Sequence, residues 1–155
     1  MIPRCFVAIL ASALLTSCAS KEPTHGGDYK VLSARPTPRD WKPGAVWTFV
    51  TAKKSGVTES LTVRMTDEIA KTCTSGVWRK LQVVRGRVPQ LGGEPTQPAC
   101  MVEGSFLWIS LLAPWCDIDD DIRGRLEGNT FTGDRTQGGM MGSDLVGTVR
   151  GWRVN

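Results

Sequence analysis

The chain has 155 residues, a formal net charge of +4 at pH 7, one histidine, five cysteines and six tryptophans. The positive charge is mild and spread along the sequence, so it predicts no nucleic-acid partner. The sequence contains no Gly-x-Ser-x-Gly elbow, no Cys/His pair and no metal-ligand spacing. We therefore expect a protein that is not an enzyme and that needs no cofactor.

The N-terminus has the order of features found in a bacterial secretion signal. Arg4 supplies a positive start, residues 6–15 are apolar and uncharged, and Leu-Thr-Ser-Cys follows at 15–18. The apolar run is too short for a membrane helix, which needs roughly 20 residues. The tetrapeptide resembles the lipobox of bacterial lipoproteins, which implies cleavage before Cys18 and its acylation, for example with palmitate. An ordinary signal peptide with an incidental Cys18 is the alternative.

The residues after Cys18 bear on location. They are Ala19 and Ser20, and neither is the Asp that lipoproteins use for retention at the inner membrane. The resemblance thus implies a protein of the outer membrane, held by its lipid and facing the periplasm.

The rest of the chain divides into two parts. Residues 18–43 are rich in Pro and Gly and lack an apolar period, which predicts a flexible tether that also holds the single histidine, His25. Residues 44–155 are enough for one domain with a real core. With the signal at 1–17, we expect one β-domain behind a lipid anchor.

Short β-type runs begin at residue 46. The segments 46–51, 61–66 and 77–85 are rich in β-branched and aromatic residues or alternate in polarity, with Leu81 and Val83 on the inner face of the third.

The middle of the chain is less regular. Residues 86–98 predict a long loop, and residues 99–112 predict one strand that is apolar on both faces. A helix is the alternative for 99–112, but Gly104 and Pro114 favour a strand.

The last third predicts a hairpin and a final long strand. The hairpin joins 122–126 to 130–132, a mobile loop covers 137–143, and the last strand covers 144–154. Gly147 and Gly151 would let that strand bend, as a closing sheet requires.

These runs predict an all-β fold, an antiparallel meander of about seven to eight strands that forms a small barrel or a sandwich. Gly44 and Trp47 at the first strand, with Arg150 and Arg153 on the last, resemble the lipocalin and wider calycin arrangement, in which a first-strand Trp packs under a last-strand Arg. The resemblance implies a closed barrel.

Two sets of side chains are candidates for binding. Asp117, Asp119 and Asp121 have the alternate spacing of calcium loops, but Ile122 and Gly128 replace the Gly and Glu that such loops need, so a solvated acidic turn is the favoured interpretation. Four tryptophans could contact a flat ligand or a partner, although core packing is the commoner role of Trp. They are Trp78, Trp108, Trp115 and Trp152.

Three cysteines remain after Cys5 is cleaved away and Cys18 is acylated. If 77–85 pairs antiparallel with one strand over 99–112, Cys116 returns to the end that holds Cys73, and Cys100 lies at the opposite pole. The sequence predicts a Cys73 to Cys116 disulfide. Cys100 is then a buried, inert thiol or an intermolecular link.

Two functions remain. The first is a non-catalytic binding or inhibitor module that holds an envelope protein or a small ligand, with the loops 86–98 and 137–143 as contacts. The alternative is a structural or assembly lipoprotein of the cell envelope.

Overall fold

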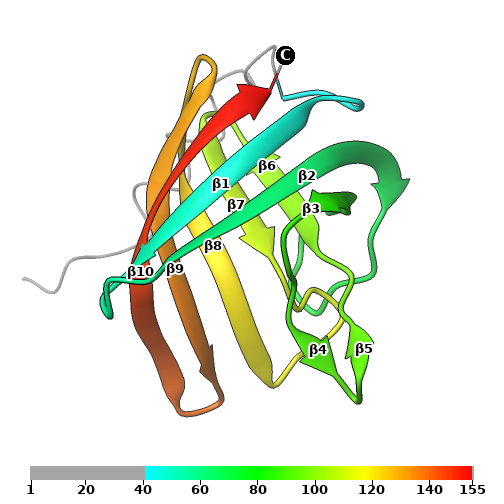
Figure 1. Cartoon of the computed structure of the whole chain (residues 1–155). Coiled ribbons are helices and arrows are strands. Elements are labelled where there is room, and N and C mark those ends of the chain that lie inside the picture. The colour runs from blue at the N-terminus through cyan, green and yellow to red at the C-terminus, as the bar shows by residue number, and fades with distance from the viewer. Residues whose placement is uncertain (1–40, 155) are drawn as a thin grey trace, which may run out of the picture.

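Eight antiparallel strands close into a barrel in the computed structural model, which describes residues 41–154 (Figure 1). Neighbours follow the order β1-β10-β9-β8-β7-β6-β3-β2, and the described residues contain no helix. The all-β antiparallel prediction is confirmed, and the barrel is the correct choice over the sandwich. The barrel strands are β1 (Val46–Lys53), β2 (Thr58–Ile69), β3 (Arg79–Arg85), β6 (Ala99–Glu103), β7 (Phe106–Ser110), β8 (Ile118–Glu127), β9 (Thr130–Gly139) and β10 (Gly142–Val154).

The two ends of the barrel differ in chemistry. The base, where β1 begins, is filled by aromatic rings: Trp41 lies 5.2 Å from Trp47 between ring centroids, and Phe49 meets Phe131 edge to face at 5.3 Å. These rings are buried and belong to the main core. The opposite end, where β1 ends and β2 begins, we call the mouth. The rings fill the base, whereas the mouth holds charged side chains that include Glu59, Asp120 and Arg135.

Glycines on the inner wall make room for the two phenylalanine rings. A Cβ atom at Gly151 would lie 2.7 Å from the Phe49 ring, and one at Gly124 or Gly133 would lie 2.7 or 2.8 Å from the Phe131 ring. Larger side chains there would collide with the core. Gly151 therefore serves close packing on the inner face of β10, which is the strand that the sequence predicted to be thinned by glycine.

One strand prediction and two loop predictions need correction. Residues 99–112 form the hairpin β6–β7, because Gly104 takes a positive φ of 57° and turns the chain. The predicted loop 86–98 contains a small hairpin of its own, β4 (Gln90–Leu91) with β5 (Glu94–Pro95). The predicted loop 137–143 is mostly strand, since β9 and β10 pair up to Gly139 and Gly142 and leave a tight turn with exposed methionines.

The predicted disulfide is present, but the topology behind the prediction was wrong. Cys73 and Cys116 are bonded, with Cα atoms 5.3 Å apart. Cys100 pairs in register with Arg79 at the start of β3, so it does not lie at the opposite pole. What separates Cys100 from the other two is the face of the strand: its side chain is buried in the barrel core. Cys100 is thus the buried free thiol that the sequence allowed, and burial raises its pKa to about 12, which disfavours the reactive thiolate.

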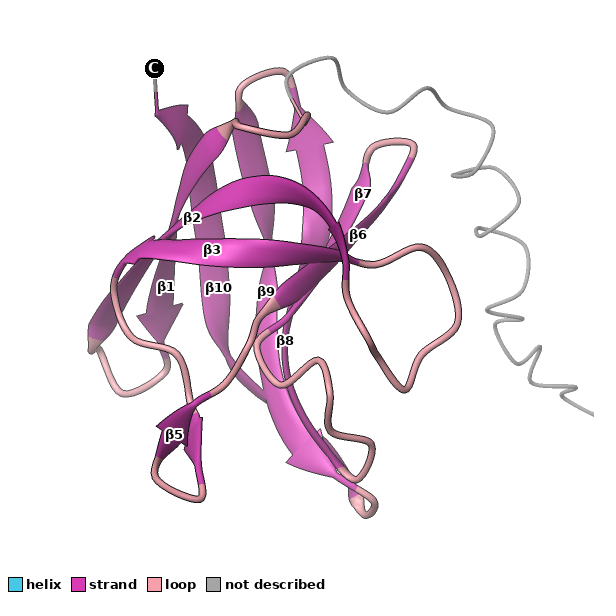
Figure 2. Ribbon diagram, turned by 90° about the vertical axis from the view of Figure 1, so that its right-hand side faces the viewer, coloured by secondary structure: helices cyan, strands magenta, loops and turns pink. Residues whose placement is uncertain are grey.

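The disulfide fastens a loop to the outside of the barrel. The segment between β2 and β3 forms a wide loop that projects from the barrel in Figure 2. The buried Trp78 at the end of this loop packs on Ala99, Met101 and Ala113. Trp108 meets Trp78 edge to face at 5.1 Å. The bond between Cys73 and Cys116 therefore holds a second, smaller apolar cluster against the outer face of β6 and β7.

Removal of this disulfide should destabilise the domain. The variant with Cys73→Ser and Cys116→Ser should lose roughly 2 to 4 kcal/mol in free energy of unfolding, because an unfolded chain free of that crosslink has more entropy. Urea unfolding with and without a reductant measures this. The reductant should lower the stability of the wild type and leave the variant unchanged; a wild type that is insensitive to reduction would contradict the prediction.

Candidate functional site

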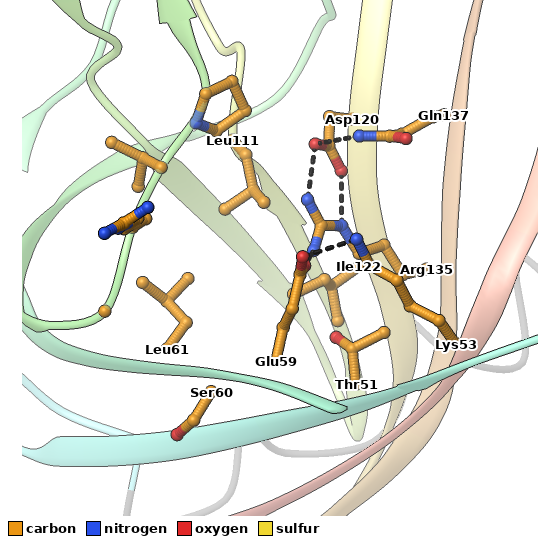
Figure 3. Close-up of a pocket in the computed structure, with 14 residues that line it drawn as sticks. Thr51, Lys53, Glu59, Ser60, Leu61, Leu111, Asp120, Ile122, Arg135 and Gln137 are labelled. Atoms are coloured by element: carbon orange, nitrogen blue, oxygen red, sulfur yellow. Dashed lines mark hydrogen bonds and ion pairs between the residues drawn. The ribbon is translucent and has the colours of Figure 1, made fainter. Parts of the chain in front are cut away.

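The main candidate site is a cavity of about 520 Å³ at the mouth of the barrel (Figure 3). Its volume lies in the range of small-molecule sites, which are often found at the mouths of β-barrels. One part of the lining is apolar and another part carries charge. The lining residues used below are Thr51, Lys53, Glu59, Leu61, Arg87, Val88, Pro89, Leu111, Asp120, Ile122, Arg135 and Gln137.

A buried ion pair forms the inner wall of this cavity. Asp120 on β8 is only 1% exposed, and both of its carboxylate oxygens accept hydrogen bonds at 2.7 Å from Arg135 on β9, one from Nε and one from Nη2. Nε2 of Gln137 donates a third bond of 2.7 Å to Asp120. A planar guanidinium matches a carboxylate in this two-pronged way, so the geometry of the pair is tightly fixed.

The pair extends across the cavity to the other side of the barrel. Nη1 of Arg135 donates to Glu59 on β2 at 2.8 Å, and Lys53 on β1 forms an ion pair with the other oxygen of Glu59. The hydrogen bond from Lys53, helped by the charge of Arg135, lowers the pKa of Glu59. The hydrogen bonds to Asp120 raise the pKa of Arg135. We call these four side chains the mouth network, in which two cationic and two anionic side chains face one another.

The local sequence explains why these charges point inward. On β8 the side chains of Asp120 and Ile122 lie on the same face, because successive residues of a strand alternate, and Ile122 is in the core. On β9 the same rule places Arg135 on the face of the buried Phe131. Register pairs Ile122 with Arg135 and Asp120 with Gln137, so the side chains meet between the two strands.

Sequence reasoning missed the mouth network. The feature that could have revealed it is a charged residue at an inward position near the end of a strand face that is otherwise apolar. That feature can be recognised only when the strand register is known. The interpretation of the acidic segment as a solvated turn is wrong. Strand β8 already begins at Ile118, and Asp120 and Asp121 are both buried.

The three predicted cation candidates lie on the outer face of the barrel. Asp119 accepts a hydrogen bond of 2.8 Å from Ser143, and Asp121 accepts one of 2.6 Å from Arg123. Asp117 lines the same shallow outer groove as these two residues. Across residues 41–154, no group of three or more His, Cys, Asp or Glu side chains could hold a metal ion.

The four candidate tryptophans do not form one site. Trp78 is buried under the outer loop, and Trp108 carries the guanidinium of Arg123 at 3.9 Å from its ring centre. Trp115 and Trp152 are about half exposed, at 52% and 45%. Trp115 shares the outer groove with Trp108, and Trp152 lies on the outside of β10. None of the four lines the mouth cavity.

Comparison with known proteins found no matching family model, no matching curated protein and no matching solved structure. The part of the chain that the structure describes has no helix long and apolar enough to cross a membrane. Cys18 and His25 lie outside the described residues. The site therefore has to be interpreted from its own chemistry.

Loss of one partner of the buried pair should cost far more than loss of both. Arg135→Met leaves the Asp120 carboxylate buried without its cation, which should cost roughly 3 to 5 kcal/mol in free energy of unfolding. The double variant Arg135→Met with Asp120→Leu should recover most of that loss, since no charge is left buried. Denaturant unfolding of the two variants tests this; equal stability of both would contradict a desolvated pair.

The mouth network should also make stability depend on acid pH. The folded-state pKa of Glu59 lies below its ordinary value of 4.5, so its contribution is complete above pH 4.5 and is lost as the pH falls through the lower folded-state value. Glu59→Gln should therefore flatten the loss of stability below pH 4.5, as measured by thermal unfolding from pH 7 to 3. Glu68→Gln, which removes an exposed carboxylate paired with Lys80, is the matched control and should retain the wild-type slope.

Proposed function

We propose that this protein is a lipid-anchored, non-catalytic binding module that holds a small ligand in the mouth of its barrel. The observation that carries the proposal is the mouth cavity itself. Aromatic rings fill the opposite end of the barrel, and the charged side chains of the mouth network that line the cavity are paired with one another without a ligand. A binding site of this kind is preformed, so a ligand meets little reorganisation cost.

The state of the charged groups supports binding over catalysis. A general base needs an oxygen that can reach the substrate proton and a pKa near the working pH. Both oxygens of Asp120 are engaged by Arg135, and both oxygens of Glu59 are engaged by Lys53 and Arg135. The lowered pKa of Glu59 makes it a weak base. These carboxylates suit a structural wall better than a reacting centre.

The position of the chain entry supports an anchored module with an accessible mouth. Trp41, the first described residue, packs on Trp47 at the base, so the described part of the chain begins at the end opposite the mouth. An anchor at Cys18, as the lipobox resemblance implies, is therefore compatible with a mouth that is open to a ligand of the periplasm.

One pairing supports the calycin-like interpretation of the barrel. Trp47 on β1 lies directly opposite Arg153 on β10 in register, so both side chains start from the inner face at the base. Arg150, the other candidate, is exposed on the outer face. Trp47 and Arg153 are therefore the two residues that a calycin-like packing would bring together.

A ligand in the mouth should be retained by the purified protein and lost when the mouth is filled. Native mass spectrometry of Cys18→Ser protein purified from the soluble fraction should show a small adduct. Val88→Trp, which places a ring at the cavity wall, should remove it. Val84→Trp, on an exposed position of β3, is the matched control and should keep it. Equal retention by both variants, or an envelope protein in place of the small adduct, would refute the mouth as the ligand site.

Lipid anchoring has its own test. Wild-type protein should incorporate labelled palmitate and sediment with outer membranes, and Cys18→Ser should do neither. If Cys18→Ser protein remains lipid-labelled in that fraction, the lipobox interpretation is wrong.

A further inference from the structure

Resting on the proposed function, we propose that the ligand is a small amphiphile with one anionic group, which binds Arg87 at the rim while the apolar part fills the mouth cavity. The site is divided in a way that fits such a molecule. Arg87 is exposed at the edge, in the segment that follows β3, and the apolar side chains lie deeper. The argument depends on which charges are already neutralised.

The mouth network neutralises itself. Asp120 binds Arg135, and Glu59 binds both Arg135 and Lys53, so two cations face two anions within hydrogen-bonding reach. Diverting Arg135 to a ligand would leave the buried Asp120 carboxylate without its cation, which is costly, and Lys53 is already paired with Glu59.

Arg87 differs from the other charged residues of the lining. Within residues 41–154 it forms no ion pair, hydrogen bond or ring contact, and it is the single lining cation without an anionic partner. The lining contains no unpaired carboxylate that could balance it. The cavity therefore carries an excess of one positive charge, located at its rim, and a guanidinium there presents its donors to a carboxylate, sulfate or phosphate group.

The deeper part of the cavity suits an apolar body. Leu61, Leu111 and Ile122 from three different strands or strand ends face it, and Val88 and Pro89 cover it from the segment next to Arg87. Burial of each methylene group of a ligand on such a surface contributes about 0.8 kcal/mol.

One polar group lies among these apolar residues. Thr51 is only 3% exposed and lines the cavity, so its hydroxyl adds a polar group to this part of the wall (Figure 3). A ligand with a polar atom along its body would suit this wall.

Matched probes separate the contributions of charge and chain. Octanoate, 1-octanol and octyltrimethylammonium share an eight-carbon chain and carry negative, neutral and positive head groups. Calorimetric titration of the full-length Cys18→Ser protein at pH 7 and low salt should rank them in that order, with octanoate roughly twofold to fivefold tighter than octanol, as expected for an exposed charged pair. High salt should shrink this gap.

Two variants assign the effect to its residue. Arg87→Gln should remove the advantage of octanoate and leave the affinity for octanol unchanged. Arg85→Gln removes a nearby exposed arginine that does not line the cavity, so it should leave all three affinities unchanged. Circular dichroism spectra of both variants check that the barrel is intact, which is expected for exposed substitutions.

The outcomes separate the two proposals. If none of the three probes binds, the mouth is not a small-ligand site for amphiphiles, and the proposed function fails with this inference. If octanol binds as tightly as octanoate, or if Arg87→Gln leaves the gap in place, the anionic class is wrong while the ligand site stands. Binding that Val88→Trp leaves unchanged would place the probes outside the mouth and overturn the inference.

Discussion

The structure depends on one constraint: the side chains on the inner face of a closed barrel must pack or pair with one another. Aromatic rings pack at the base, and charged side chains pair at the mouth. The Asp120–Arg135 pair is the centre of the charged group at the mouth. A buried ion pair adds little net stability, because desolvation offsets most of the attraction, but it strongly penalises any arrangement in which the partners separate. The network reaches from β8 and β9 to β1 and β2, so it fixes the walls of the mouth with respect to each other.

The difference between the aromatic base and the charged mouth explains why a small domain contains a cavity. Apolar side chains alone would tend to close over an empty mouth, since close packing is favourable. Charged side chains held at hydrogen-bonding distance from one another cannot collapse further without losing partners. The mouth thus keeps its shape without a ligand. Arg87 at the rim, which has no ion-pair partner among the described residues, gives the lining a net positive charge.

The sequence alone could predict the strands that alternate and an antiparallel meander, but it left the barrel and the sandwich open and could not predict contacts that depend on register. Leu81 and Val83 were placed correctly because period-2 alternation is local. The hairpin at Gly104 was missed because apolar residues on both sides of one glycine also fit a single buried strand. That error placed Cys100 at the wrong end of the barrel. The predicted disulfide was nevertheless correct, because the side chain of Cys100 points into the core and so cannot reach Cys73 or Cys116.

The candidate site was hidden for the same reason. Asp120 and Asp121 are neighbours in an acidic run, yet one faces Arg135 inside the barrel and the other faces Arg123 outside it. Composition describes both as acidic residues of a turn. Only the strand that begins at Ile118 separates them, and Arg135 becomes the partner of Asp120 only when β8 and β9 are paired in the observed register.

The most direct test of this account is nuclear magnetic resonance of the arginine Nε–H groups in the ligand-free protein. We expect the Arg135 Nε–H to be observed at neutral pH with slow exchange against water, because it donates to the buried Asp120, while the Nε–H of Arg87 exchanges fast. Exchange at Arg135 as fast as at Arg87 would contradict a mouth whose charges are paired before the ligand binds.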